Sequence, residues 1–163
     1  MIVPRVLTPV PLSTIPDALD VAHRGLWGYS LPDPAYQLAA AQLKLEHGVR
    51  DGALHGVFNF NFGNHDATRQ DLSDPSVPIF ETVPEHEGNA ASTATQVHHR
   101  RAYPDLDSGL RGYWQALRDG FPDAYDALVD GPEAFAAALK RERYFTADEW
   151  VYAKGLERLM AEV

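Results

Sequence analysis

The sequence contains no cysteine among its 163 residues. A disulfide framework, a cysteine-ligated zinc site and a thiol nucleophile are therefore excluded. Basic residues are scarce as well, because 14 Lys and Arg stand against 23 Asp and Glu, which gives a formal net charge of −9. Binding to nucleic acid or to an anionic membrane surface requires a basic face. We therefore expect neither nucleic acid nor a membrane as a partner.

Long apolar runs are also missing. Prolines stand at four positions of the first sixteen residues, which carry a single arginine. A signal peptide needs an uninterrupted apolar helix that these prolines would break, so we do not interpret the start as one. Residues 1–15 are instead predicted to form an extended arm lying over the domain. Because about 100–200 residues make one domain, and no repeat or linker is visible, residues 1–163 are predicted to form a single domain.

Helical signals dominate the chain. Residues 17–25 and 34–47 each follow or begin with a proline and end at a glycine, Gly25 or Gly48, which is typical of helix ends. Further helices are predicted over 105–120 and 122–129, and from about 130–133 onward. The last helix is expected to start with a capping box between Thr146 and Glu149. Its inner face would bury Trp150, Val151, Leu156, Leu159 and Met160.

The middle of the chain has a different composition. Residues 48–75 are rich in Gly, Asn and Asp and are interpreted as loops around the apolar segment 53–62. Residues 77–83 and 97–103 are predicted to form the strands of a hairpin, joined by a polar flap over 84–96. The expected fold is α+β but mainly α: a helical domain with a small β-hairpin lobe.

Glu46 is the first candidate for chemistry. It stands in the last turn of the apolar helix 34–47, where the helix dipole and apolar neighbours both disfavour a charged carboxylate. A carboxylic acid that keeps its proton near neutral pH can protonate a leaving oxygen, as glycosidases require. The alternative is an ordinary surface glutamate.

A second candidate is the loop over 59–64, in which amides alternate with aromatic rings. Amides can pair with hydroxyl and acetamido groups of a carbohydrate, and rings can stack on sugar faces. The candidate substrate-binding residues there are Asn59, Phe60, Asn61, Phe62 and Asn64. The alternative is a turn whose asparagines bond their own backbone.

The hairpin supplies candidates for a second carboxylate: Glu81, Glu85 and Glu87. A carboxylate facing Glu46 could orient a water or stabilise an oxocarbenium-like state, although each of these residues could equally lie in a solvated loop. Tyr103 and Tyr144 lie beside predicted helices, where an aromatic residue can belong either to a site or to the core.

Taken in order, these strings resemble the glucosaminidase domains of glycoside hydrolase family 73 and their relatives in the lysozyme superfamily. The resemblance spans about residues 17–161. It rests on Leu-x-Leu-Glu46-x-Gly48, Asn59-x-Asn61-x-Gly63-Asn64, residues 82–88, Arg101-Ala102-Tyr103, and Tyr144-Phe-Thr-Ala-Asp148 followed by Tyr152.

The resemblance implies a lysozyme-like fold and cleavage of the β-1,4 glycan strands of peptidoglycan, as an N-acetylglucosaminidase or, as a close alternative, a muramidase. It implies a general-acid role for Glu46, a second acid at Glu85 (or Glu81 or Glu87), a catalytic-site tyrosine at Tyr103 and substrate contact at Tyr144. Three positions depart from the family pattern: His47 replaces Ser or Thr, Val49 an aromatic residue and Arg100 a Phe.

No cofactor is expected. The sequence has seven histidines but no HExxH motif and no histidine pair at helical spacing, so we predict no metal site. A Gly-x-Ser-x-Gly elbow and a phosphate-binding loop are absent too.

Two functions from different classes stay open. The first is a peptidoglycan glycosidase, and the second is a non-catalytic lysozyme-like domain that binds glycan or has a structural role in a phage or secretion assembly. In either case we expect a monomer that reaches the cell wall or periplasm through lysis, a secretion system or a virion, with a delivery or scaffold protein as a further partner.

Overall fold

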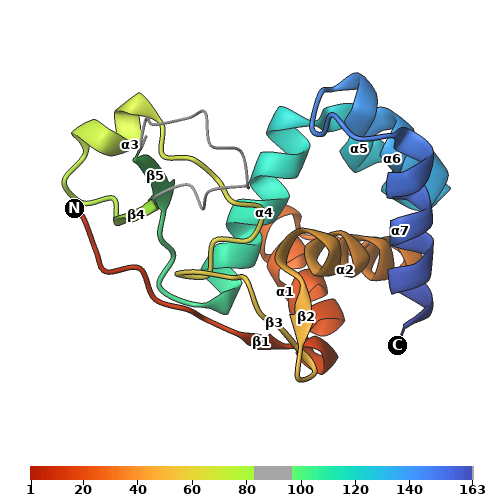
Figure 1. The fold of residues 1–163 in the computed structure, drawn as a ribbon, viewed down its shortest axis with the longest axis horizontal. Coiled ribbons are helices and arrows are strands. Elements are labelled where there is room, and N and C mark those ends of the chain that lie inside the picture. Colours follow the sequence, from red (N-terminus) through yellow and green to blue (C-terminus); the bar gives the residue numbers. More distant parts are fainter. Residues whose placement is uncertain (83–96, 163) are drawn as a thin grey trace, which may run out of the picture.

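The structure is a computed structural model that describes residues 1–82 and 97–162. It is mainly helical, with a small hairpin lobe at one end and two groups of helices beyond it (Figure 1). The mainly α architecture expected from the sequence is confirmed. The predicted flap over 84–96, together with Glu85 and Glu87, lies outside the described residues.

The centre of the molecule is α2 (Asp33–His47), which packs against α1 (Ile15–Trp27) and α7 (Glu149–Ala161). Leu38 and Leu43 of α2 are fully buried, and the alanines between them let the neighbouring helices approach closely. α4 (Leu106–Gly120) closes the core from the other side of α1, where the indole N–H of Trp114 donates to the Leu19 carbonyl oxygen at 3.0 Å. Both long helices predicted before residue 121 are therefore present.

The C-terminal helices form the second group: α5 (Pro122–Ala127), the 3-10 turn Leu128–Asp130, α6 (Pro132–Arg141) and α7. α7 contacts both α6 and α2, and Figure 1 shows it running down the side of the molecule next to the end of α2. This contact determines which residues of α7 face the candidate site.

The predicted start of the last helix was wrong. The N-cap is Asp148 rather than Thr146, because the Asp148 carboxylate accepts from the backbone N–H groups of Trp150 and Val151. The inner face accordingly begins at Tyr152 and continues at helical spacing, whereas Trp150 and Val151 are 68% and 59% exposed. Leu156 and Leu159 are buried as expected, and Met160 is partly buried against the core.

The N-terminal arm is extended, as predicted, but it also contributes a strand. β1 (Val10–Pro11), β3 (Ala53–Leu54) and β2 (Val49–Arg50) form an antiparallel sheet in the order β1-β3-β2. Single bridges join Leu7 to Phe58 and Ile2 to Ile79, so the arm runs from the sheet to the lobe (Figure 1). A 3-10 turn, Leu12–Thr14, then leads into α1.

The lobe consists of the antiparallel pair β4 (Ile79–Thr82) and β5 (His98–Arg101) and the short helix α3 (Arg69–Ser73). The region 48–75, interpreted as loops, therefore also contains β2, β3 and α3. Thr68 and Asp71 cap α3 reciprocally, but five residues are too few to show a helical period. No helix in the described part of the chain is long and apolar enough to cross a bilayer.

Candidate functional site

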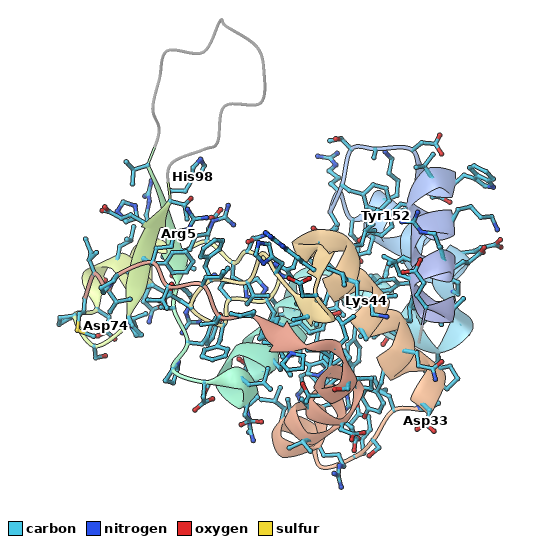
Figure 2. All side chains as sticks on the ribbon, turned by 60° about the horizontal axis from the view of Figure 1, so that its bottom comes forward. Arg5, Asp33, Lys44, Asp74, His98 and Tyr152 are labelled. Carbon is cyan, nitrogen blue, oxygen red and sulfur yellow. The ribbon has the colours of Figure 1, made fainter. Side chains whose placement is uncertain are left out.

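Glu46 lies in the last turn of α2 and faces α7. Its side chain is partly buried, and the Tyr152 hydroxyl donates a hydrogen bond to Glu46 Oε1 at 3.1 Å. Figure 2 shows Tyr152 on the side of α7 that faces α2. Because Tyr152 begins the buried stripe of α7, the packing of the two helices itself places its phenol on the carboxylate.

The surroundings of Glu46 favour its protonated form. Burial raises the pKa of the carboxyl above its ordinary value, and hydrogen bonds with Tyr152 and Tyr144 lower it only in part. The position at a helix C-terminus acts in the same direction as burial, since the negative end of the dipole disfavours a carboxylate. Glu46 therefore keeps its proton to a higher pH than an exposed glutamate does, which suits the proposed role of a proton donor.

Gln42 lies one turn before Glu46 and was missed by the sequence analysis. Its side chain is buried, and Gln42 Oε1 accepts from the Tyr113 hydroxyl of α4 at 2.7 Å. Burial and the charge of Glu46 raise the pKa values of Tyr113, Tyr144 and Tyr152, so all three phenols stay protonated and can donate. A glutamine on the apolar face of a helix, four residues before the acid, was the signal that could have identified it.

A pocket of about 390 Å³ adjoins this cluster. It lies between the end of α2, the loop after Phe62, α4 and the segment following α6. Its lining residues are Gln42, Gly63, Asn64, His65, Asp66, Tyr113, Ala116, Leu117, Phe121, Arg143 and Tyr144. Two of the predicted substrate-binding residues, Asn64 and Tyr144, are thus brought to one pocket from parts of the chain eighty residues apart.

The other polar side chains of the 59–64 loop are bonded inside the protein. Asn59 Oδ1 accepts from the Val6 N–H at 2.8 Å and Asn59 Nδ2 donates to the Pro4 carbonyl at 3.0 Å, so this amide holds the N-terminal arm. Asn61, which is 2% exposed, donates to the carbonyl oxygens of His65 and Arg101 and accepts from the His65 N–H. Asn61 thus bonds partly within its own turn, whereas Asn59 bonds only the distant N-terminal arm.

The aromatic residues of the same loop pack inward. Phe62 is fully buried in the core and Phe60 is partly buried against it. The loop lies directly on α4, where a Cβ added to Gly109 would fall 3.0 Å from Phe60 Cβ and closer still to the Phe60 carbonyl oxygen. Gly112 gives the same clearance to Tyr103. A pair of glycines three residues apart inside a predicted helix was the sequence signal for this close approach.

His47 connects the end of α2 to the loop. Its Nδ1 lies 3.2 Å from the Gly56 carbonyl oxygen and its Nε2 accepts from the Gly63 N–H at 3.0 Å, which assigns the neutral tautomer with the proton on Nδ1. Burial lowers the pKa of His47, and it lowers that of His65 to about 4. Within residues 1–82 and 97–162, no three His, Asp or Glu side chains gather closely enough to hold a metal ion.

The remaining predicted site residues either do not line this pocket or are not among the residues that the structure describes. The Tyr103 hydroxyl is 3.5 Å from His65 Nδ1, and the Tyr103 N–H donates to the Asn59 carbonyl, so Tyr103 supports the loop. Glu81 lies in β4, where its carboxylate is 3.3 Å from His99 Nε2. The structure leaves the predictions for Glu85 and Glu87 untested, because neither is among the described residues.

No family model matches the sequence, and a search of the curated proteins found no match. The fold, however, is similar to solved structures. A peptidoglycan hydrolase from Sphingomonas sp. A1 is 22% identical, with 90% of this chain and 83% of that chain covered and a TM-score of 0.55. The glycoside hydrolase domain of FlgJ from Salmonella typhimurium is 21% identical, with coverages of 93% and 84% and a TM-score of 0.56.

The catalytic domain of the autolysin Auto from Listeria monocytogenes is also similar, at 15% identity, with coverages of 93% and 81% and a TM-score of 0.58. These similarities extend over nearly the whole chain. They confirm the fold that the resemblance to lysozyme-superfamily glucosaminidases implied.

Proposed function

We propose that this protein is a glycoside hydrolase that cuts the β-1,4 glycan backbone of peptidoglycan, as an N-acetylglucosaminidase with Glu46 as its general acid. The observation that carries the proposal is the state of Glu46: a partly buried carboxyl of raised pKa, held by Tyr152 beside a pocket. The fold supports it, because solved structures of a peptidoglycan hydrolase, a glycoside hydrolase domain and an autolysin share that fold.

In the proposed reaction, the Glu46 carboxyl gives its proton to the glycosidic oxygen as the C1–O bond breaks. The resulting Glu46 carboxylate accepts the hydrogen bond of Tyr152, so the negative charge is stabilised where it forms. A water molecule then bonds to C1. Either a second carboxylate takes the proton of that water, or the substrate's own acetamido oxygen bonds to C1 first and the water then displaces it, giving its proton to the Glu46 carboxylate; both routes yield a free reducing end.

For the second carboxylate we propose Glu85, which follows Thr82 at a spacing one residue longer than the Thr-x-Glu element of the family that the sequence resembles. Glu81 and Glu87 are the alternatives in the same hairpin. Glu81 is the described one of the three, and its Oε1 lies 3.3 Å from His99 Nε2.

The proposal includes a delivery step. The surface carries a net charge of −9, and cell-wall polymers are often anionic, so long-range electrostatics oppose binding of the free domain to its substrate. Delivery through lysis, a secretion system or a virion, with a delivery or scaffold protein, would bring the domain to the wall or periplasm.

The test is cleavage of purified cell walls by the wild type, by Glu46→Gln and by Glu149→Gln, a matched change at an exposed glutamate. We expect Glu46→Gln to lose turbidity-clearing activity by about 10²–10⁴-fold, the usual contribution of general acid catalysis. Its melting temperature should not fall, because the substitution removes a buried carboxyl. Glu149→Gln should behave like the wild type.

Mass spectrometry of the released fragments then identifies the bond. Fragments with N-acetylglucosamine at the reducing end support a glucosaminidase. Fragments with N-acetylmuramic acid at the reducing end would instead identify a muramidase. Equal activity of Glu46→Gln and the wild type would overturn the role of Glu46. If the wild type binds glycan but releases no fragments, the proposed catalytic activity is overturned and a non-catalytic lysozyme-like domain is favoured.

A further inference from the structure

The segment after α6 has an unusual residue at its turn. The Tyr144 N–H donates to the Leu139 carbonyl at 2.9 Å, and the Arg143 N–H donates to the Lys140 carbonyl at 3.1 Å. These two bonds, one enclosing the other, form the Schellman motif that ends many helices. The motif needs a left-handed residue, and here that residue is Arg143, with φ = 62°.

Glycine is the usual residue at such a position because a Cβ in the left-handed region approaches the following carbonyl oxygen. The same chain follows that rule after α1, where Gly28 is left-handed with φ = 78°, whereas α4 and α7 end at residues of negative φ. An arginine at the end of α6 therefore costs free energy that a glycine would save. Strain of this kind is typically retained where the side chain has a function.

The turn places two side chains at the candidate site. Tyr144 is close enough to Glu46 to affect its pKa, and Arg143 lines the neighbouring pocket. Burial and the two tyrosine hydroxyls account for the pKa of Glu46, so Arg143 is not the partner of the acid. Arg143 instead lines the pocket next to Tyr144, where another part of a bound glycan would lie.

The pocket gives Arg143 no fixed counter-charge. The Asp66 carboxylate, also in the lining, is 3.3 Å from Arg100 Nε. Arg143 takes part in none of the ion pairs among residues 1–82 and 97–162. His65, with a pKa of about 4, is uncharged at neutral pH. A protein with a net charge of −9 therefore presents in this pocket an exposed arginine that pairs with no carboxylate among the described residues.

We infer that Arg143 is a specificity-determining residue that binds a carboxylate of the wall glycan while Glu46 acts on the neighbouring glycosidic bond. This inference rests on the proposed function and names which part of the substrate the pocket recognises. A planar guanidinium can form two parallel hydrogen bonds to a carboxylate. Peptidoglycan carries carboxylates on its stem peptide and, after the peptide is removed, on the lactyl ether of muramic acid, whereas N-acetylglucosamine oligomers carry none.

The test variant is Arg143→Gly, which relieves the left-handed strain and removes the charge together. Its melting temperature is expected to rise by about 2–4 °C, the shift typical of a domain of this size for such relief. Arg143→Lys keeps both the charge and the strain. Arg141→Ala removes a cation from the last turn of the same helix, at an exposed residue outside the pocket lining.

Binding is measured by titration calorimetry in the Glu46→Gln background with three probes: an N-acetylglucosamine oligomer, wall glycan stripped of its peptides, and peptide-bearing glycan. Arg143→Gly is expected to weaken binding of carboxylate-bearing glycan by about tenfold, the amount typical of one lost hydrogen bond to a charged group. Its affinity for the neutral oligomer should not change. Arg141→Ala should bind all three probes normally, and Arg143→Lys should recover part of the lost affinity.

The pattern of loss identifies the carboxylate. A loss with peptide-bearing glycan alone assigns the stem peptide, a loss with the stripped glycan alone assigns the lactyl group, and a loss with both shows that Arg143 binds either carboxylate. Equal affinities of Arg143→Gly and its parent for every probe, or an equal loss on the neutral oligomer, would overturn the inference. A wild type that cleaves no wall would overturn the proposed function separately, because the binding ratios are measured without catalysis.

Discussion

The two sides of the candidate site are held together in different ways. Around Glu46, helices α2, α4 and α7 converge through buried side chains, and Tyr152 and the Tyr113–Gln42 pair supply hydrogen bonds in the interior. In the hairpin lobe, all four residues of β5 are histidine or arginine and are partly exposed. Three of them lie within 4.0 Å of carboxylates: His99 of Glu81, Arg100 of Asp66 and Arg101 of Asp71. The comparison indicates that the main core and the fixed acid belong to the helices, whereas the lobe buries Ile79 and Phe80 apart from that core and carries partly exposed charged pairs at its surface.

The largest expected difference concerns the same substitution on the two sides. Leu38→Ala in α2 removes a fully buried side chain and should lower the free energy of unfolding by about 2–5 kcal/mol. Leu72→Ala in α3 of the lobe, at a residue that is 51% exposed, should change it by about 0.5 kcal/mol or less. Urea denaturation of both variants measures the difference. Equal losses would show that the lobe shares the helical core.

A smaller effect, on the pH dependence of activity, is expected when the hydrogen bond between Tyr152 and Glu46 is removed. Tyr152→Phe deletes the hydrogen bond that lowers the pKa of Glu46, so that pKa should rise further. Because the protonated form of Glu46 is the active one, the alkaline limb of the pH–activity profile should move to higher pH. Since the carboxylate formed in the reaction also loses this bond, activity at the optimum should fall.

The pH–activity profile of Tyr152→Phe on purified walls measures both effects. Tyr29→Phe, at an exposed tyrosine whose hydroxyl contacts Tyr125, is the matched control and should leave the profile unchanged. An alkaline limb that stays in place in Tyr152→Phe would separate Tyr152 from the titration of Glu46.

The smallest effect is expected in the lobe. The pair of Arg100 with Asp66, whose side chain is 68% exposed, should contribute about 0–1 kcal/mol of unfolding free energy at low salt, and Arg100→Ala removes it together with the hydrogen bond of the guanidinium to the Asn64 carbonyl oxygen. The contribution of the pair should shrink further at 1 M salt because mobile ions screen exposed charges. A double-mutant cycle with Asp66→Ala measures the pair itself. A coupling well above 1 kcal/mol that salt leaves unchanged would contradict the proposed contrast between the two sides.

Much of the helical side could be predicted from local signals. Proline and glycine at the ends of α2 mark its limits, and the place of Glu46 in the last turn of an apolar helix predicts a raised pKa, of which burial is the main cause in the structure. The predicted start of α7 was wrong by two residues, because Thr146 and Asp148 both suit an N-cap and it is the Asp148 carboxylate that accepts from the backbone N–H groups of Trp150 and Val151. Local signals therefore located the helix but not its inner face.

The lobe and the 59–64 loop were less predictable because their contacts join distant parts of the chain. The amides of Asn59 and Asn61 could have met either a sugar or the backbone, and their sequence is the same in both cases. The structure shows that they bond the N-terminal arm and the strand β5, about 53 and 40 residues away. Such partners leave no local periodicity to detect.

The sequence by itself determined the charge balance, the absence of thiol chemistry, the helical architecture and the candidate acid, because composition and helix-end signals act within a few residues. The tertiary structure alone decided what surrounds that acid. Tyr152 lies on one side of it, and the pocket lined by Tyr144, Arg143 and Asn64 lies on the other. These residues come from parts of the chain that no repeating sequence pattern connects. They meet because burying the apolar faces of α2, α6 and α7 against one another leaves a single arrangement of their polar ends.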